Sequence, residues 1–193
     1  LNDLFVSDST FRGSNITSES VINISNKYCN NTLTIINSNF FDVIVDGNCT
    51  IIYVRGSIGN VSGCDFVNCQ FNENASAIYW DGNDGYLSIK KSVLSYNTAK
   101  NNGAISNYKS KALIVKTTIR NNYGKYSVGA INNDKGSMNI IDTTLKNNRG
   151  KHIGTIHNYY GKLIISNSKL INNIATEDGG VAISNSNGKV TTT

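Results

Sequence analysis

The chain has 193 residues, a formal net charge of +5 and 17 glycines, but no proline. It contains no run of 18 or more apolar residues and no charged segment followed by an apolar one, so the sequence predicts neither a membrane span nor a signal peptide. At this length we expect one elongated domain rather than two globular ones.

A repeat of 25 to 29 residues, counted from the sequence, runs through the chain. One apolar anchor per unit fixes the register: Phe11, Phe40, Phe66, Leu94, Ile119, Leu145 and Leu170. An apolar residue precedes each anchor by five positions, and Ser, Thr or Cys precedes it by two. A unit this short cannot bury its own apolar side chains, so neighbouring units must stack.

Each unit is predicted to hold three short strands. The first strand is predicted from inward-facing positions seven and five residues before the anchor. The second is predicted from inward-facing positions two residues before the anchor and at the anchor itself. A third strand is predicted to end at an isoleucine: Ile78, Ile105, Ile131, Ile156 or Ile183. The expected fold is all-β, a right-handed parallel β-helix of about seven coils, with the handedness taken from the usual rule for parallel crossovers. Residues 1–59 are predicted to form irregular coils and residues 60–193 regular coils of one domain.

Asparagine recurs in two columns, and both predict structural ladders. One column lies three residues past the anchor: Asn97, Asn122, Asn148 and Asn173. The other lies two residues past the third-strand isoleucine: Asn107, Asn133, Asn158 and Asn185. Asparagine tolerates left-handed turns, and its amide can bond to the equivalent amide one coil away. We therefore expect these residues to cap strands and fix the coil register rather than to bind a ligand.

The repeats resemble those of known surface proteins. The Gly-Ala-Ile segments that begin at Gly103 and Gly129, each followed by an apolar-x-x-Asn segment, look like the repeats of chlamydial polymorphic outer-membrane proteins. The composition of the chain, which is rich in Asn, Ile, Lys and Tyr and has no Pro, resembles more closely that of the adhesin-like surface proteins of gut methanogens, which are archaea. The chain departs from the chlamydial pattern by having Leu or Ile where Phe is expected in its last four units. The resemblance implies an extracellular, cell-surface stalk or adhesion module, and both ends fall in mid-coil register, as expected for part of a longer protein.

Charge is divided unevenly, with a net −6 over residues 1–86 and +11 over residues 87–193. Lys100, Lys125 and Lys151 are predicted to share one column, and Arg120 and Lys146 another. Positive charges that stack in register repel each other unless a bound anion neutralises them. The columns therefore predict a groove for acidic glycans or anionic cell-wall polymers. The alternative is that these side chains keep exposed strands soluble. Nucleic acid is not predicted as a partner, because no recognised nucleic-acid-binding motif accompanies the charge.

Several aromatic residues follow the third strand, in loops expected at one edge of the solenoid. They are Tyr79, Trp80, Tyr86, Tyr108, Tyr159 and Tyr160. Of these, Trp80, Tyr159 and Tyr160 are candidates for stacking on sugars. Trp80 takes the place of a ladder asparagine, so the alternative is that it plugs the adjoining coil.

Metal and cofactor sites are not predicted. The segment from Asp81 to Gly85 resembles a calcium loop but lacks a downstream bidentate Glu, and a plain turn is expected instead. His152 and His157 have no clustered Cys or carboxylate beside them. Glycoside hydrolysis needs two carboxylates facing one cleft, but the acidic residues of the regular half share no column: Asp134, Asp142, Glu177 and Asp178. The sequence therefore predicts no enzyme.

All four cysteines lie in the first 69 residues. Cys64 and Cys69 occupy inward columns and are expected to be small buried fillers, whereas Cys29 and Cys49 are candidates for a disulfide across one coil. Six N-x-S/T sequons begin at Asn15, Asn23, Asn30, Asn48, Asn60 and Asn74. If these asparagines carry glycans, the acidic half of the chain, residues 1–86, would form a glycosylated face.

The function expected from the sequence is that of a non-catalytic, adhesin-like module that mediates attachment or extends as a stalk. Surface glycans or proteins of host, microbe or cell wall are the expected partners. The alternatives are a carbohydrate-active β-helix enzyme whose catalytic coils lie elsewhere and a purely structural spacer.

Overall fold

The computed structural model describes residues 3–13, 15–17, 19–25, 31–47, 49–56, 58–73, 76–82, 85–177 and 179–193. Across these residues the structure is all-β: every regular element is a strand, and all strand pairs are parallel. No helix in this described part is long and apolar enough to cross a membrane.

The strands form four parallel sheets, named A to D in the order in which the chain visits them. Sheet A is made of β1 (Leu4–Ser7), β5 (Thr32–Ile36), β9 (Ile58–Ser62), β13 (Tyr86–Lys90), β17 (Lys111–Val115), β21 (Ser137–Ile141), β25 (Lys162–Ser166) and β29 (Lys189–Thr192). Sheet B is made of β2 (Thr10–Arg12), β6 (Asn39–Phe41), β10 (Asp65–Val67), β14 (Val93–Ser95), β18 (Thr118–Arg120), β22 (Thr144–Lys146) and β26 (Lys169–Ile171).

The other two sheets complete each coil. Sheet C is made of β3 (Asn15–Ile16), β7 (Ile44–Val45), β11 (Gln70–Phe71), β15 (Thr98–Ala99), β19 (Tyr123–Gly124), β23 (Arg149–Gly150) and β27 (Ile174–Ala175). Sheet D is made of β4 (Ile22–Ser25), β8 (Ile52–Arg55), β12 (Ile78–Asp81), β16 (Ile105–Tyr108), β20 (Ile131–Asp134), β24 (Ile156–Tyr159) and β28 (Ile183–Ser186).

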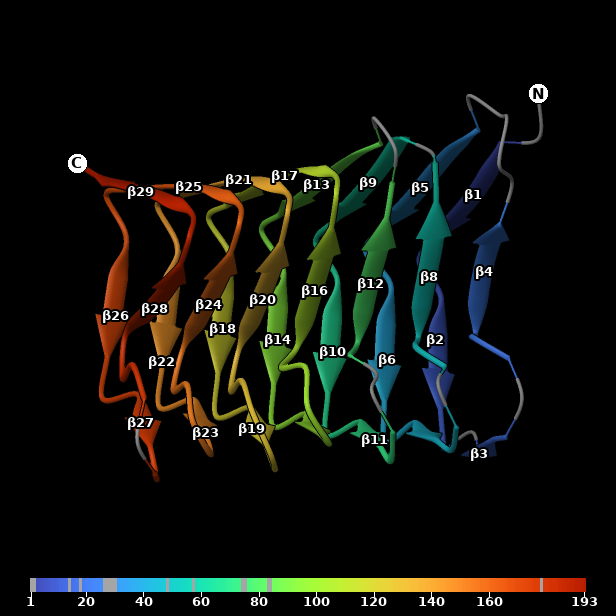
Figure 1. Cartoon of the computed structure of the whole chain (residues 1–193). Coiled ribbons are helices and arrows are strands. Elements are labelled where there is room, and N and C mark those ends of the chain that lie inside the picture. The colour runs from blue at the N-terminus through green and yellow to red at the C-terminus, as the bar shows by residue number, and fades with distance from the viewer. Residues whose placement is uncertain are drawn as a thin grey trace.

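The chain winds as a β-solenoid of seven coils, with the two termini at opposite ends (Figure 1). The described strands within residues 1–59 join the same four sheets as the later coils. Neighbouring coils are separated by the ordinary distance between paired strands, as the stacked rings of Phe11, Phe40 and Phe66 show with centroid distances of 4.8 Å. The parallel solenoid predicted from the repeat is therefore confirmed, while its right-handed winding stays a prediction of the crossover rule.

Each coil has four strands, so the prediction of three was wrong. The additional strands are those of sheet C, which are only two residues long and carry no alternation that a sequence pattern could reveal. The prediction that the third strand ends at its isoleucine was also wrong. Strands of sheet D begin at Ile78, Ile105 and Ile131 and continue for three more residues that alternate inward and outward.

At three of the corners, described residues with left-handed backbone angles recur from coil to coil. Between sheets A and B these residues are Asp8, Asn37, Gly63, Lys91, Lys116, Asp142 and Asn167. Between sheets B and C they are Gly13, Asp42, Asn68, Tyr96, Asn121, Asn147 and Asn172. Between sheets D and A they include Gly56, Lys109, Lys135, Tyr160 and Asn187. Gly, Asn and Asp dominate because they enter this region at the lowest steric cost. The ladder asparagines themselves are not left-handed, contrary to what was expected of them.

The first asparagine ladder runs along the corner between sheets B and C. The side chains of Asn97, Asn122 and Asn148 each donate from Nδ2 to Oδ1 of the next asparagine, at 3.0 Å in every step. That Oδ1 also accepts the backbone N–H of the same donor residue, for example at 3.0 Å from Asn97 to Asn122. A second Nδ2 bond runs back to an anchor carbonyl, as from Asn122 to Leu94 at 3.0 Å. Both ends of each internal amide are thus satisfied in a buried position.

The second ladder lies on the inward side of sheet D rather than in a turn. Nδ2 of Asn107, Asn133 and Asn158 donates to Oδ1 of the next asparagine at 2.8, 2.7 and 2.7 Å. Each amide also reaches the corner carbonyl three residues ahead, as from Asn133 to Gly136 at 3.1 Å. A Cβ at Gly136 would lie 2.1 Å from Asn107 Nδ2, so the corner beside this ladder has no room for a side chain. Both predicted ladders are confirmed.

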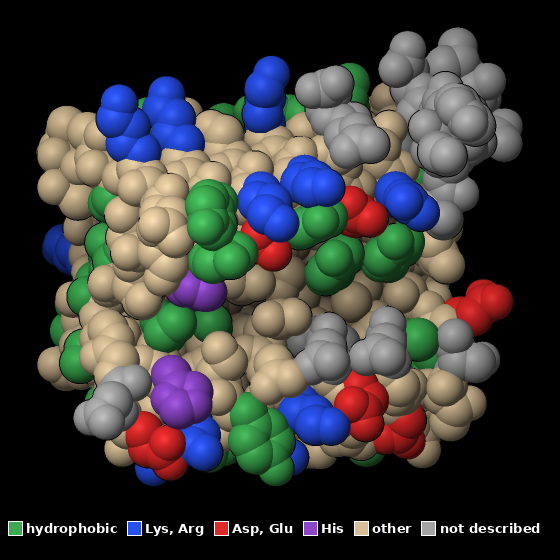
Figure 2. All heavy atoms as spheres, in the orientation of Figure 1, with side chains coloured by type: hydrophobic (Ala, Val, Ile, Leu, Met, Phe, Trp, Pro, Cys, Tyr) green, Lys and Arg blue, Asp and Glu red, His purple; other side chains and the backbone are tan. Residues whose placement is uncertain are grey.

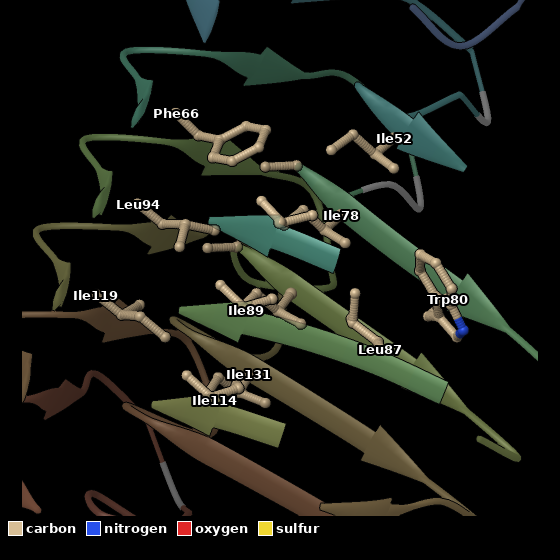
Figure 3. Packing of buried hydrophobic residues seen from close by; sticks show 14 of the residues in the cluster. Ile52, Phe66, Ile78, Trp80, Leu87, Ile89, Leu94, Ile114, Ile119 and Ile131 are labelled. Atoms are coloured by element: carbon tan, nitrogen blue, oxygen red, sulfur yellow. The ribbon is translucent and has the colours of Figure 1, made fainter. Parts of the chain in front are cut away.

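Inward side chains of all four sheets fill the centre of the solenoid. Figure 3 shows those of sheets A, B and D in the middle of the chain. Trp80 points inward from β12 and is fully buried. A Cβ at Gly59, which stands where most coils have a larger apolar residue, would lie 1.9 Å from Trp80 Cη2. Trp80, the largest side chain of the core, therefore fits because Gly59 in sheet A has no side chain.

The predicted burial of Cys64 and Cys69 is confirmed, and both are free thiols, as is Cys49. Burial raises the pKa of the Cys69 thiol to about 11. Cys29 lies outside the described residues, as do the sequons at Asn30, Asn48 and Asn74.

Replacing Asn122 with alanine is expected to destabilise the fold by about 3 kcal/mol or more, because the Leu94 carbonyl, the Asn97 N–H and the Asn148 amide each lose a buried partner. Denaturant unfolding measures the loss. The matched control is Asn121→Gly at the adjoining left-handed position, which should change the free energy of unfolding little. Equal losses in the two variants would contradict a structural role for the ladder.

Replacing Gly59 with alanine is expected to cost about 1–3 kcal/mol of stability through overpacking against Trp80. The same change in a Trp80→Leu background should cost much less, since the opposing ring is gone. The four proteins form a double-mutant cycle that thermal or urea unfolding can complete. Additive losses would show that Gly59 is required for another reason.

Candidate functional site

Most of the predicted basic residues lie on one side of the solenoid, over sheets B and C. We call this surface the basic face, and it consists of Lys100, Arg120, Lys125, Lys146, Arg149, Lys151 and Lys169. The four segments that carry these side chains, residues 92–100, 117–126, 143–151 and 168–176, contain no Asp or Glu. Arg120 and Lys146 are directly paired on β18 and β22, with both side chains exposed.

The column of Lys100, Lys125 and Lys151 is partly neutralised. Lys100 Nζ lies 2.9 Å from a Glu73 carboxylate oxygen, and Lys151 Nζ lies 3.3 Å from one of Glu177. The hydrogen bond from Lys100 to Glu73 raises the pKa of that lysine. Two of the three lysines in this column therefore already have an anionic partner.

The remaining cations of the basic face have no ion pair within the described part of the chain. They are Arg120, Lys125, Lys146, Arg149 and Lys169. Tyrosines hold two of them: the Arg120 guanidinium lies 5.8 Å from the Tyr96 ring centroid, and that of Arg149 lies 5.7 Å from Tyr123. Sequence reasoning missed Arg149 and Tyr123 because they belong to sheet C, which it did not predict.

Trp80 is not an exposed ligand-binding residue, so this candidate was wrong. Its side chain is fully buried, and Nε1 has no hydrogen-bond partner among the described residues. Alternation along β12 decides the outcome, because Ile78 and Trp80 face inward while Tyr79 and Asp81 face outward. Trp80 instead ends the second asparagine ladder, directly below Asn107 in the adjoining strand.

A second surface lies over sheet D, and we call it the tyrosine face. Its outward positions form two columns. One carries Tyr53, Tyr79, Ser106, Asn132 and His157, and the other carries Arg55, Asp81, Tyr108, Asp134 and Tyr159. In Figure 2 hydrophobic side chains in green gather here with Lys and Arg in blue and Asp and Glu in red. Tyr79, Tyr108 and Tyr159 belong to strands rather than to the loops in which they were predicted, whereas Tyr160 occupies a corner.

Aromatic contacts organise both ends of the tyrosine face. The rings of Tyr53 and Tyr79 stack at 5.6 Å with an interplanar angle of 9°. Tyr159 packs edge-on against Tyr160 at 4.6 Å, and His157 lies 5.9 Å from Tyr159. Burial lowers the pKa of His157, whose Nδ1 lies 3.2 Å from Asn132 Oδ1.

Charges on the tyrosine face are largely balanced. Arg55 Nε lies 3.5 Å from a carboxylate oxygen of Asp81. The ammonium groups of Lys109 and Lys135 lie 5.0 and 5.9 Å from the Tyr108 ring centroid, on the corner column beside sheet D. Asp134 Oδ1 is buried without a hydrogen-bond partner in the described structure.

The acidic residues are less scattered than the sequence indicated. Asp81 and Asp134 share one column of sheet D, with Tyr108 on the strand between them. Asp142 lies at a corner between sheets A and B, Glu177 pairs with Lys151, and Asp178 lies outside the described residues. Asn83 and Asp84, the centre of the segment that resembles a calcium loop, also lie outside them. No group of three or more His, Cys, Asp or Glu side chains is placed to hold a metal ion in the part of the chain described.

No family model, no curated protein and no solved structure matches this chain. The resemblance to adhesin-like proteins and chlamydial repeats therefore stays a prediction.

The pKa of Tyr79 provides a test of its half-buried place on the tyrosine face. Burial, with a contribution from the Asp81 carboxylate, raises this pKa from 10.0 to about 12. The neutral phenol therefore contributes stability that is complete below pH 10 and is lost as the pH rises towards 12, because the unfolded chain ionises first. Relative to Tyr79→Phe, the wild type should lose at most about 2 kcal/mol over this range after allowance for solvent screening. Urea unfolding of both proteins between pH 9 and 12 measures the difference, and a constant difference would contradict the shift.

Proposed function

We propose that this chain is a non-catalytic, adhesin-like module of a cell surface whose basic face binds acidic glycans or other anionic polymers. The observation that carries the proposal is the in-register pair of Arg120 and Lys146, with Arg149 near it, none of which has an ion pair within the described part of the chain. The stacked coils also make it suitable as an extended stalk that holds other parts of a protein away from a surface.

Electrostatics favours a polymeric anion as the partner. Arg120 and Lys146 stand about 4.8 Å apart at their backbones, a distance at which like charges repel each other in the absence of a counter-charge. A chain of uronate or sulfated sugars that runs along the solenoid axis would bring negative groups to successive coils. The guanidinium groups of Arg120 and Arg149, packed on tyrosines, are ordered for paired contacts with carboxylate or sulfate oxygens.

A carbohydrate-active enzyme is the second candidate, because Asp81 and Asp134 face the same side of sheet D. Their strands are two coil spacings apart, about 10 Å, whereas inverting glycosidases place their carboxyl groups about 6.5–9.5 Å apart and retaining ones closer still. Asp81 is also engaged in an ion pair with Arg55. Binding without turnover is therefore the better supported function.

The test measures binding of the chain to immobilised polygalacturonate, dextran sulfate and unmodified dextran at low and physiological salt. We expect salt-sensitive binding to the two acidic polymers only. The combined change of Arg120, Lys146 and Arg149 to glutamine should weaken it at least about tenfold, since each exposed contact is worth about 1 kcal/mol. Lys100 and Lys151 are poorer targets because they already pair with Glu73 and Glu177.

The matched control removes three cations from sheet A instead, by changing Lys111, Lys162 and Lys189 to glutamine. Equal weakening in both variants would show a general charge effect rather than a binding face. Absence of binding at either salt concentration would favour a purely structural stalk. Release of reducing or unsaturated sugar ends during the incubation would favour the enzyme.

A further inference from the structure

Sheet A runs along one side of the solenoid (Figure 1), and its outer surface carries several large apolar side chains. Every second residue of its strands points away from the core, and we call these outward positions the apolar face. Phe5 and Ile58 are 64% and 47% exposed, and Leu113, Ile141 and Ile164 are partly exposed. Apolar side chains gathered on a surface in this way mark a site of interaction with another molecule.

A small cavity lies in the apolar face. It has a volume of about 160 Å³ and is lined by Tyr86, Lys111, Ala112, Leu113, Ser137 and Asn139. Sites for small molecules usually measure about 300–1,000 Å³, so this cavity suits a single protruding side chain better than a separate ligand. Ile58 protrudes from the same face, in the outward column that continues through Tyr86 and Lys111 to Ser137.

The shape and size of the apolar face suit a contact between two flat surfaces. Successive coils show little twist, since the stacked rings of Phe11, Phe40 and Phe66 are inclined by only 3° and 4° to each other. Eight strands about 4.8 Å apart and up to five residues long cover about 34 Å by 16 Å. Two such faces packed together bury about 1,100 Å², slightly more than the roughly 1,000 Å² expected of a specific interface.

The charge of the chain favours a second copy in the opposite direction as the partner. Residues 1–86 have a net charge of −6 and residues 87–193 of +11. Packing in opposite directions places the acidic half of each copy against the basic half of the other. Packing in the same direction would bring like charges together, which complementary interfaces avoid.

Reversal of the strand order also matches large side chains with small ones. It places β9 opposite β21 and β13 opposite β17, while each outward column stays opposite itself. Ile58 of each copy then faces Ser137 of the other, at the cavity. Other facing pairs likewise join a bulky residue to a small one: Leu113 and Ser88, Ile36 and Ser166, and Ile141 and Ser62. Side chains of two packed sheets interdigitate in this manner.

We propose that the apolar face of sheet A is a dimer interface, at which two copies of the chain pack in opposite directions with Ile58 of each in the cavity of the other. The contact is self-complementary, because each copy supplies both the protruding residue and the cavity. The basic face lies over other sheets, so this interface does not depend on the proposed binding of anionic polymers.

Sedimentation velocity of the whole chain over a wide range of concentration tests the dimer. We expect a species of twice the chain's mass whose share increases with concentration. Ile58→Gln should weaken dimerisation at least about tenfold, because each dimer contains the change twice and loses apolar burial at both places. The matched control Ile174→Gln changes an isoleucine of sheet C that is 53% exposed, and it should leave dimerisation unchanged.

Cross-linking tests the direction of packing. Ile58→Cys and Ser137→Cys proteins, each with Cys29 and Cys49 replaced by serine, are mixed and treated with a short bismaleimide. Cys64 and Cys69 are buried, so the reagent reaches the introduced thiols. The mixed product should exceed both products of like chains, because packing in the same direction would separate positions 58 and 137 by three strand spacings, about 14 Å.

A chain that stays monomeric throughout would overturn the proposal. So would a dimer that tolerates Ile58→Gln, or one that Ile174→Gln weakens equally. Cross-links mainly between like variants would contradict the opposed direction. A monomer that binds vesicles of phosphatidylglycerol and loses this binding in Ile58→Gln would assign the apolar face to a lipid surface instead.

Discussion

The structure depends on one constraint, the in-register pairing of every strand with its counterpart one coil away. Parallel pairing places residue upon equivalent residue, so each position of the repeat becomes a column of side chains 4.8 Å apart. Whatever a column contains must tolerate its own kind as a neighbour. Phenylalanine rings stack on each other, and asparagine amides bond donor to acceptor, so in-register pairing stabilises the interior. Cations repel each other, so the same pairing leaves like charges side by side on the surface.

The residue types that fill the interior columns differ along the chain. The first three anchor residues are phenylalanines, and the later ones are Leu or Ile beside asparagine ladders. Trp80 and Gly59 lie where the two solutions meet, with a large side chain opposite none. The total side-chain volume within a coil is conserved, although the volume at a single column position is not. The coils can therefore stay in register.

The repeat period, both ladders and the solenoid could be predicted because each rests on a residue type that recurs at a fixed spacing. Sheet C could not, since a strand of two residues has no alternation to detect, and Arg149 and Tyr123 were overlooked with it. The position of Trp80 was misjudged because the third strand was expected to end at Ile78, whereas it begins there and buries every second residue. The outward columns of sheet D could not be predicted either, because only the pairing between strands determines which residues of different coils lie side by side.

The uneven distribution of charge acquires a direction once the coils are stacked. Residues 1–86, with net charge −6, and residues 87–193, with net charge +11, follow each other along the solenoid axis. The molecule therefore has an electric dipole along this axis, negative towards the first coil and positive towards the last. Near a negatively charged surface such a dipole experiences a torque that turns the last coils towards that surface, and the torque weakens as salt shortens the range of the field. Alignment of this kind acts before any side chain makes contact.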